Sequence, residues 1–94
     1  MIYKKENYII FAVKNGFIVY NQNKEFSEGH THLKSFNACK TIIDLAIKNK
    51  IPRSNSFYYL RSLTRITDNE DYKRRIEELI EVKRDKGKKN YKNK

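Results

Sequence analysis

Two apolar runs near the start of the chain predict a β-hairpin. The runs are residues 8–13 and 17–20, and Asn15 and Gly16 lie between them. Asn-Gly supplies the two positive-φ residues of a type I′ turn, whose twist suits a hairpin with a two-residue loop. We therefore expect two antiparallel strands joined by a tight turn at these two residues.

Both faces of this predicted hairpin are apolar. A type I′ turn pairs Val13 with Ile18 and Phe11 with Tyr20, and Ile9 lies on the same face as these residues. The opposite face carries Tyr8, Ile10, Ala12, Phe17 and Val19. One face packs on helices, and the other needs a further cover, either a helix or a partner. We expect a homodimer, or a tight complex with a partner, to cover this second face.

Residues 21–29 are mostly polar and predict a loop, and residues 30–34 predict a short third strand. Side chains on a strand alternate between its two faces. Alternation places His30, His32 and Lys34 on one face of this strand. The two histidines and the lysine would therefore lie side by side.

The spacing of apolar residues predicts a first helix over residues 36–49. Ser35 is a favourable N-cap. The helix ends before Ile51-Pro52, because the residue before a proline is disfavoured in the α region. Five residues follow the helical spacing of one buried stripe: Phe36, Cys39, Ile43, Ala46 and Ile47.

Two further helices are expected in the second half of the chain. Ser54 or Ser56 can cap a helix that ends near Ile66. Its inward side would carry Tyr59, Leu60, Leu63 and Ile66. The segment 67–70 has the spacing of a capping box and opens a third helix, which Gly87 would stop.

Strands followed by helices are typical of the α+β class. With 94 residues, the chain has the usual size of one domain. We expect an antiparallel β-hairpin with a possible third short strand, then three α-helices, in a single domain over residues 1–86. Residues 87–94 would form a flexible basic tail.

The net charge of +10 indicates an anionic partner. Residues 36–66 carry six basic and one acidic side chain, residues 67–86 carry six and seven, and residues 87–94 carry four and none. The excess therefore lies in the middle of the chain and in the tail. This pattern predicts nucleic acid, a ribonucleoprotein or a nucleotide as the partner.

Several classes of protein are not indicated by the sequence. Cys39 is the only cysteine, which excludes an internal disulfide and a cysteine-based zinc site. The first residues lack the pattern of a signal peptide, and no run approaches the roughly 18 apolar residues of a membrane span. Catalytic and phosphate-loop motifs are also missing. We expect a cytoplasmic, non-enzymatic protein without metal, cofactor or membrane contact.

The second predicted helix carries the clearest candidate for binding phosphate. Tyr58, Arg61, Ser62 and Arg65 share the face opposite its apolar stripe, and Arg53 lies just before the helix. Arginine forks suit bidentate contacts with phosphate, and a tyrosine ring can stack on a base. The alternative is an ordinary solvated face.

The lysines of the tail are a second candidate for binding nucleic acid. Lys88 and Lys89 lie with Lys92 and Lys94 in a segment without acidic residues. Such an arm attracts any polyanion in a salt-dependent way. The alternative is a tail that only increases solubility.

His30, His32 and Lys34 are candidates for acid–base chemistry on a phosphodiester. One imidazole could take a proton and the other give one, while the lysine stabilises the developing charge. The two histidines could instead supply two ligands to a zinc ion, with a third from a distant carboxylate. A polar strand edge next to a turn shows the same residues.

The chain resembles, in style and size, the small proteins encoded by phages and mobile elements. The features concerned are its richness in Lys, Asn, Ile and Tyr, the compact hairpin followed by the segment 29–33, the helix end at Ile51-Pro52 and the basic tail. Many such proteins block host defence, as anti-CRISPR proteins or as sponges for nucleotide signals. The resemblance implies a location in the host cytosol. Since many anti-CRISPR proteins are acidic DNA mimics, a charge of +10 implies a different mechanism here, in which the protein grips a nucleic acid, a nucleotide or an acidic surface.

The leading hypothesis is a non-enzymatic protein that binds a phosphate-rich partner and antagonises a nucleic-acid-based host defence system. One alternative is a small DNA- or RNA-binding regulator. Another is a metal-independent ribonuclease centred on His30 and His32.

Overall fold

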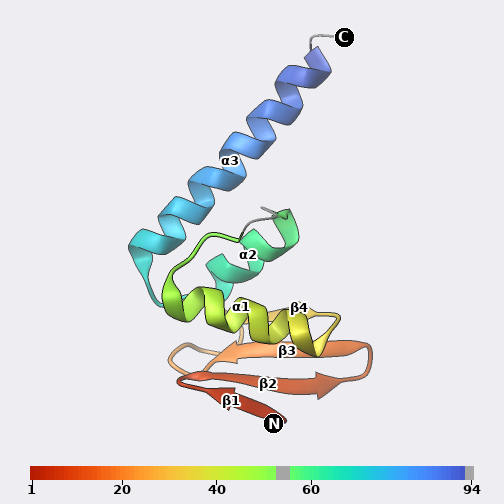
Figure 1. Cartoon of the computed structure of the whole chain (residues 1–94), viewed down its shortest axis with the longest axis vertical. Helices are drawn as coiled ribbons and strands as arrows, with labels where there is room; N and C mark the ends of the chain where they lie inside the picture. The colour runs from red at the N-terminus through yellow and green to blue at the C-terminus, as the bar shows by residue number, and fades with distance from the viewer. Residues whose placement is uncertain (53–55, 93–94) are drawn as a thin grey trace.

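The chain folds into one antiparallel sheet with helices on one side (Figure 1). The computed structural model describes residues 1–52 and 56–92, with side chains as far as Arg84. Within these residues the elements are β1 (Tyr3–Lys5), β2 (Tyr8–Val13), β3 (Gly16–Asn21), β4 (His30–Leu33), α1 (Phe36–Lys48), α2 (Phe57–Ile66) and α3 (Glu70–Lys92). The predicted α+β class is confirmed.

The four strands are paired in their order along the chain, β1-β2-β3-β4. The predicted third strand is confirmed as β4, which pairs antiparallel with β3. β1 was not predicted. It pairs with β2 after a turn in which Glu6 has a φ of 53°. β1 has three residues, two of them lysines, so it shows no local strand pattern.

The turn between β2 and β3 differs from the prediction. Val13 pairs with Gly16, so the two loop residues are Lys14 and Asn15. Gly16 has a φ of 152°, whereas Asn15 is not among the described non-glycine residues with positive φ. The predicted type I′ turn at Asn15-Gly16 is therefore wrong. The register is displaced by two residues, which leaves each side chain on its predicted face.

The helices cover the face of the sheet that was expected to meet a partner. Tyr8, Ile10 and Val19 belong to the main hydrophobic core, and Phe17 packs against it. The helices contribute the other large buried side chains: Cys39, Ile42, Ile43, Leu60, Leu63, Ile66, Tyr72 and Ile76. The cover that this face needs is therefore supplied by the chain's own helices. The opposite face, with Phe11 and Val13, lies away from the helices.

The helix starts show which capping predictions hold. Ser35 Oγ accepts a hydrogen bond from the Ala38 N–H at 3.0 Å, so the predicted cap of α1 is confirmed. The start of α3 differs from the predicted capping box. Asn69 Oδ1 accepts the Tyr72 N–H at 2.9 Å, so Asn69 rather than Thr67 caps this helix.

The last helix is longer than predicted. α3 continues through Gly87 to Lys92, so the expected stop at Gly87 is wrong. Its C-terminal part extends away from the rest of the fold, and the molecule measures 48 × 30 × 24 Å (Figure 1). A helical glycine costs only about 1 kcal/mol relative to alanine, which helix-forming neighbours can offset. The flexibility expected of residues 87–94 stays a prediction.

A buried asparagine ties the sheet to the connection between α2 and α3. Asn21 is fully buried, and its Nδ2 donates to Ile66 O and to Asp68 Oδ1, both at 2.8 Å. Its Oδ1 accepts from Asn7 Nδ2 at 2.6 Å and from the Asn23 N–H at 2.9 Å. The amide thus uses both of its N–H donors and both lone pairs of its oxygen. This network fixes the C-terminal end of α2 against the sheet.

Candidate functional site

Helix α2 lies along β4, which is an edge strand of the sheet. Tyr58 Oη donates a hydrogen bond to His32 O at 2.6 Å, and Arg65 Nε donates to His30 O at 2.8 Å. These bonds occupy backbone carbonyls of the strand. Two residues of the predicted phosphate-binding stripe, Tyr58 and Arg65, therefore also hold α2 against β4.

Ser62 was expected on an exposed face of the helix, but it is buried. Only 2% of its surface is exposed, and its Oγ lies 2.8 Å from Thr31 Oγ1 in a buried hydrogen bond. The spacing of Tyr58, Ser62 and Arg65 does define one stripe of the helix. The stripe faces β4 because α2 packs on the edge of the sheet, which the helical period alone does not determine.

Three basic residues from separate segments line one hollow, which we call the cationic hollow. Lys24 comes from the loop after β3, Arg65 from α2 and Lys73 from α3. The hollow has a volume of about 530 Å³, and its remaining lining is Ser27, Glu28 and Thr64. No ion pair within the described part of the chain involves Lys24, Arg65 or Lys73. Three positive charges therefore face one carboxylate.

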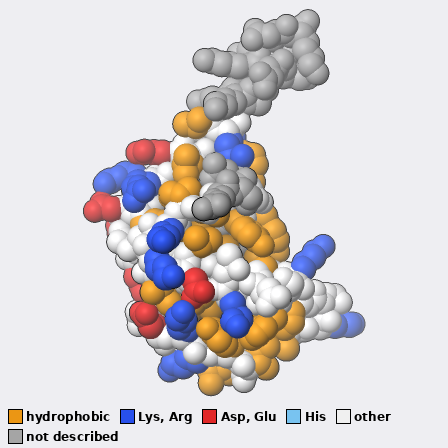
Figure 2. All heavy atoms as spheres, in the orientation of Figure 1, with side chains coloured by type: hydrophobic (Ala, Val, Ile, Leu, Met, Phe, Trp, Pro, Cys, Tyr) orange, Lys and Arg blue, Asp and Glu red, His pale blue; other side chains and the backbone are white. Residues whose placement is uncertain are grey.

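A second hollow lies where β4 meets the β2–β3 turn, and we call it the aromatic hollow. Tyr58, His32 and Phe17 line it, together with Lys14 and Lys34. Its volume is about 340 Å³. Basic side chains project from the end of the sheet that carries this turn (Figure 2). The aromatic hollow thus combines apolar walls with a basic rim.

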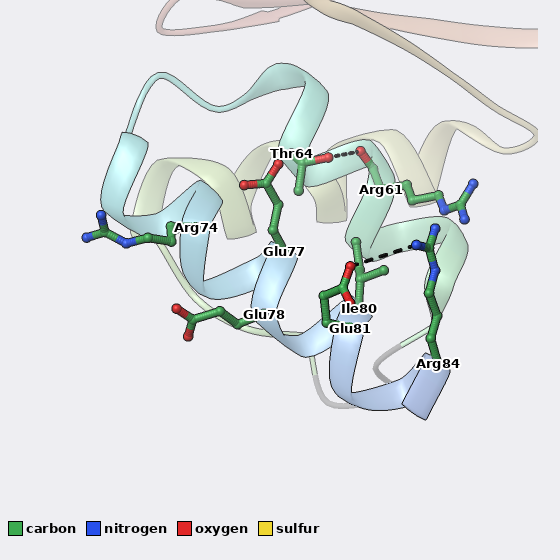
Figure 3. Close-up of a pocket in the computed structure, with 8 residues that line it drawn as sticks. All are labelled: Arg61, Thr64, Arg74, Glu77, Glu78, Ile80, Glu81 and Arg84. Atoms are coloured by element: carbon green, nitrogen blue, oxygen red, sulfur yellow. Dashed lines mark hydrogen bonds and ion pairs between the residues drawn. The ribbon is translucent and has the colours of Figure 1, made fainter. Parts of the chain in front are cut away.

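Arg61 lies in different surroundings, in a groove between α2 and α3 (Figure 3). Three arginines and three glutamates line this mixed-charge groove: Arg61, Arg74, Arg84, Glu77, Glu78 and Glu81. Arg84 lies 3.9 Å from Glu81, and Arg74 pairs with Asp71 at 2.8 Å. The charges of the groove balance, so it does not favour an anion.

The structure keeps the two predicted catalytic histidines side by side but gives them different contacts. The ring of His30 stacks on Phe26, with centroids 4.2 Å apart and planes 5° from parallel. Its Nδ1 is hydrogen-bonded to Phe26 O, which requires the proton on that nitrogen. His32 and Lys34 line the aromatic hollow instead. The imidazoles are near neighbours, with centroids 5.2 Å apart, but His30 packs on the loop.

The described residues also bear on metal binding, thiol chemistry and membrane insertion. No group of three His, Cys, Asp or Glu residues there could hold a metal ion. Cys39 is buried, and burial raises the pKa of its thiol to about 11, so it is a poor nucleophile at neutral pH. Within the same residues, none of the helices has the length and apolar character needed to cross a membrane.

Three predicted contact residues cannot be placed. Arg53 lies outside the described residues, and so do the side chains of Lys88 and Lys89. Four lining residues of the two hollows were not predicted from the sequence: Lys24, Lys73, Lys14 and Phe17. Because Lys24 and Lys73 are far apart in sequence, no local spacing relates them. The excess of basic residues was the only signal.

Comparison with protein-family models, with curated proteins and with solved structures finds no match to this chain.

Proposed function

We propose that this protein binds nucleic acid without catalysing a reaction, and that it contacts backbone phosphates where α2 meets β4. The observation that carries the proposal is the cationic hollow. Lys24, Arg65 and Lys73 converge there from three segments of the fold. The net charge of +10 supports an anionic partner of some length rather than a single small ion.

Arg65 is suited to phosphate because its guanidinium is already held in place. The bond from its Nε to His30 O leaves the two terminal nitrogens as a fork. A fork of this kind forms two parallel bonds to phosphate oxygens, and holding it in advance reduces the entropy lost on binding. Lys24 and Lys73 add point charges from neighbouring segments. These contacts give affinity and position without reading sequence.

A salt titration of affinity tests the proposal. Each phosphate contact that is lost should reduce the slope of log affinity against log salt by roughly one. We expect the double variant Lys24→Ala, Lys73→Ala to reduce the slope by about two and to weaken binding of an oligonucleotide at least about tenfold in 0.1 M salt. The matched control is Arg61→Ala, Arg74→Ala, which removes the same charge from the mixed-charge groove. Equal losses in the two double variants would mean diffuse attraction and would reject the cationic hollow as the contact.

The biological setting stays a hypothesis. A phage-encoded antagonist of a nucleic-acid-based host defence and a small DNA- or RNA-binding regulator are both compatible with a protein of this kind. Co-purification of bound nucleic acid and bound protein from the native host distinguishes them. For the ribonuclease alternative, the test is cleavage of labelled RNA that is lost on His32→Ala.

A further inference from the structure

We infer that the aromatic hollow receives an unstacked base, so that the partner is a single-stranded nucleic acid rather than a duplex. This inference rests on the proposed function, because the cationic hollow would supply the phosphate contacts that bring the strand to the protein.

The walls of the aromatic hollow offer rings that are held in place. Tyr58 is 48% exposed, yet its hydroxyl is fixed by the bond to His32 O at 2.6 Å. Phe17 is half-buried, and its ring lies 6.1 Å from that of Phe36. Val13, 42% exposed, adds apolar surface. A base can stack on such a ring at little cost in side-chain entropy, since the ring is already ordered.

The charges around this hollow match a nucleotide. Lys14 lies in the β2–β3 turn and Lys34 directly follows β4. No acidic side chain is among its lining residues in the described part of the chain. A base would meet the apolar wall, while its phosphate would meet the lysines. A purely apolar ligand would leave these two lysines without a counter-charge.

The size and position of the hollow favour a single strand. A volume of about 340 Å³ is near the lower end for pockets that take small molecules, and so suits one base with its sugar. In a duplex the bases are paired and stacked, and cannot enter without being flipped out. Tyr58 and Arg65 are seven residues apart on α2, which corresponds to roughly 10 Å along the helix. One strand can therefore place a base in the aromatic hollow and a phosphate in the cationic hollow.

The test compares four labelled probes of equal length by fluorescence anisotropy: single-stranded RNA, single-stranded DNA, an abasic DNA strand and a DNA duplex. The abasic strand keeps the phosphates and lacks the bases. We expect the protein to bind the base-bearing strands about 5- to 150-fold more tightly than the abasic strand, the range for one stacked base. The RNA and DNA arms show which sugar is preferred.

Variants assign this preference to the aromatic hollow. Tyr58→Leu should bring the affinity for base-bearing strands down to that for the abasic strand. Tyr58→Leu and Tyr58→Phe both lose the bond to His32 O, so the difference between the two variants reports on the ring alone. Tyr58→Phe keeps the ring and should retain most of the preference. The Lys24→Ala, Lys73→Ala variant should weaken all single-stranded probes by the same factor.

Crosslinking with the unaltered chain provides a measurement that does not depend on a variant folding. A strand that contains a photoreactive halogenated uracil should attach to Tyr58 or Phe17. Attachment only at residues outside the aromatic hollow would overturn the inference.

The outcomes separate the two proposals. Equal affinity for base-bearing and abasic strands, or tighter binding of the duplex, overturns the inference and leaves the proposed function standing. Failure to bind any of the probes at low salt overturns both.

Discussion

Arg61 and Arg65 lie one turn apart on α2, yet they have different electrostatic surroundings. Arg65 donates to a strand carbonyl and shares the cationic hollow with two lysines. Arg61 lines the mixed-charge groove, whose lining carries as many glutamates as arginines. From the sequence alone, the two arginines are equally good candidates for binding phosphate. The difference arises from the segments that pack beside each one, so local charge density does not identify a binding surface.

The largest expected effect is a loss of stability of the whole fold at alkaline pH, which would unfold both hollows together. Burial raises the pKa values of Tyr8 and Tyr72 to about 12, from ordinary values near 10. Because these pKa values are higher in the folded state, their contribution to stability is complete below about pH 10 and is lost as the pH rises towards 12. We expect the free energy of unfolding to fall by at least about 3 kcal/mol between pH 9 and pH 12. Urea unfolding across this range measures it.

Tyr72→Phe provides the control for the alkaline effect. This variant loses the hydrogen bond from Tyr72 Oη to Lys50 O, at 2.6 Å, and should cost about 1 kcal/mol at neutral pH. Above pH 10 it should show a shallower loss of stability than the unaltered chain. An unchanged slope would mean that Tyr72 does not titrate in this range.

The second expected effect is a weaker attachment of α2 to the sheet, which would alter the surroundings of both arginines. Asn21→Ala removes four hydrogen bonds of a fully buried amide, including the buried bond to Ile66 O at the end of α2. We expect a loss of about 2–4 kcal/mol in the free energy of unfolding. Asn23→Ala removes only an exposed bond to Asp68 and should cost less than about 1 kcal/mol. Similar urea midpoints for the two variants would contradict the role assigned to Asn21.

A third variant affects the aromatic hollow and spares the cationic one. At Gly16 a Cβ would lie 2.6 Å from Leu33 O, and the φ of 152° is unfavourable for any other residue. We expect Gly16→Val to cost at least about 2 kcal/mol in urea unfolding. Asn15→Ala should be within about 0.5 kcal/mol of the unaltered chain, because Asn15 has no positive φ. A large loss in the free energy of unfolding for Asn15→Ala would instead support the predicted type I′ turn.

The smallest expected effect comes from removing acidic charge near Arg61, so that its surroundings become more like those of Arg65. Glu77→Gln with Glu81→Gln removes two of the three carboxylates that line the mixed-charge groove. We expect a gain of about threefold in affinity for a single strand at 50 mM salt, and almost none at 0.5 M, because screening shortens the range of exposed charges. An equal gain at both salt concentrations would point to a direct contact rather than a change in potential.

Most of the fold could be predicted because its signals are local. Two apolar runs located the hairpin, the segment 30–34 predicted the third strand, and helical spacing located the three helices. Ser35 marked the start of α1. The errors have non-local causes. β1 is defined by its pairing with β2, and Gly16 lies against the backbone of β4. Both depend on parts of the chain that the local pattern does not contain.

The candidate site was less predictable than the fold. The stripe of Tyr58 and Arg65 was correctly identified as one side of a helix, but the direction it faces depends on where α2 packs. Lys24 and Lys73 meet Arg65 only after the loop, α2 and α3 have assembled. Helical spacing relates residues within one element and gives no information about such convergence.

The bonds that orient Tyr58 and Arg65 also have a consequence for solubility. β4 would otherwise present unpaired carbonyls on an edge strand, which are a template for the addition of strands from other chains. By occupying those carbonyls, the two side chains that we expect to contact the ligand also protect the edge from intermolecular pairing. Substitutions at Arg65 should therefore lower binding and promote aggregation together, so that selection for solubility alone would retain part of the binding surface.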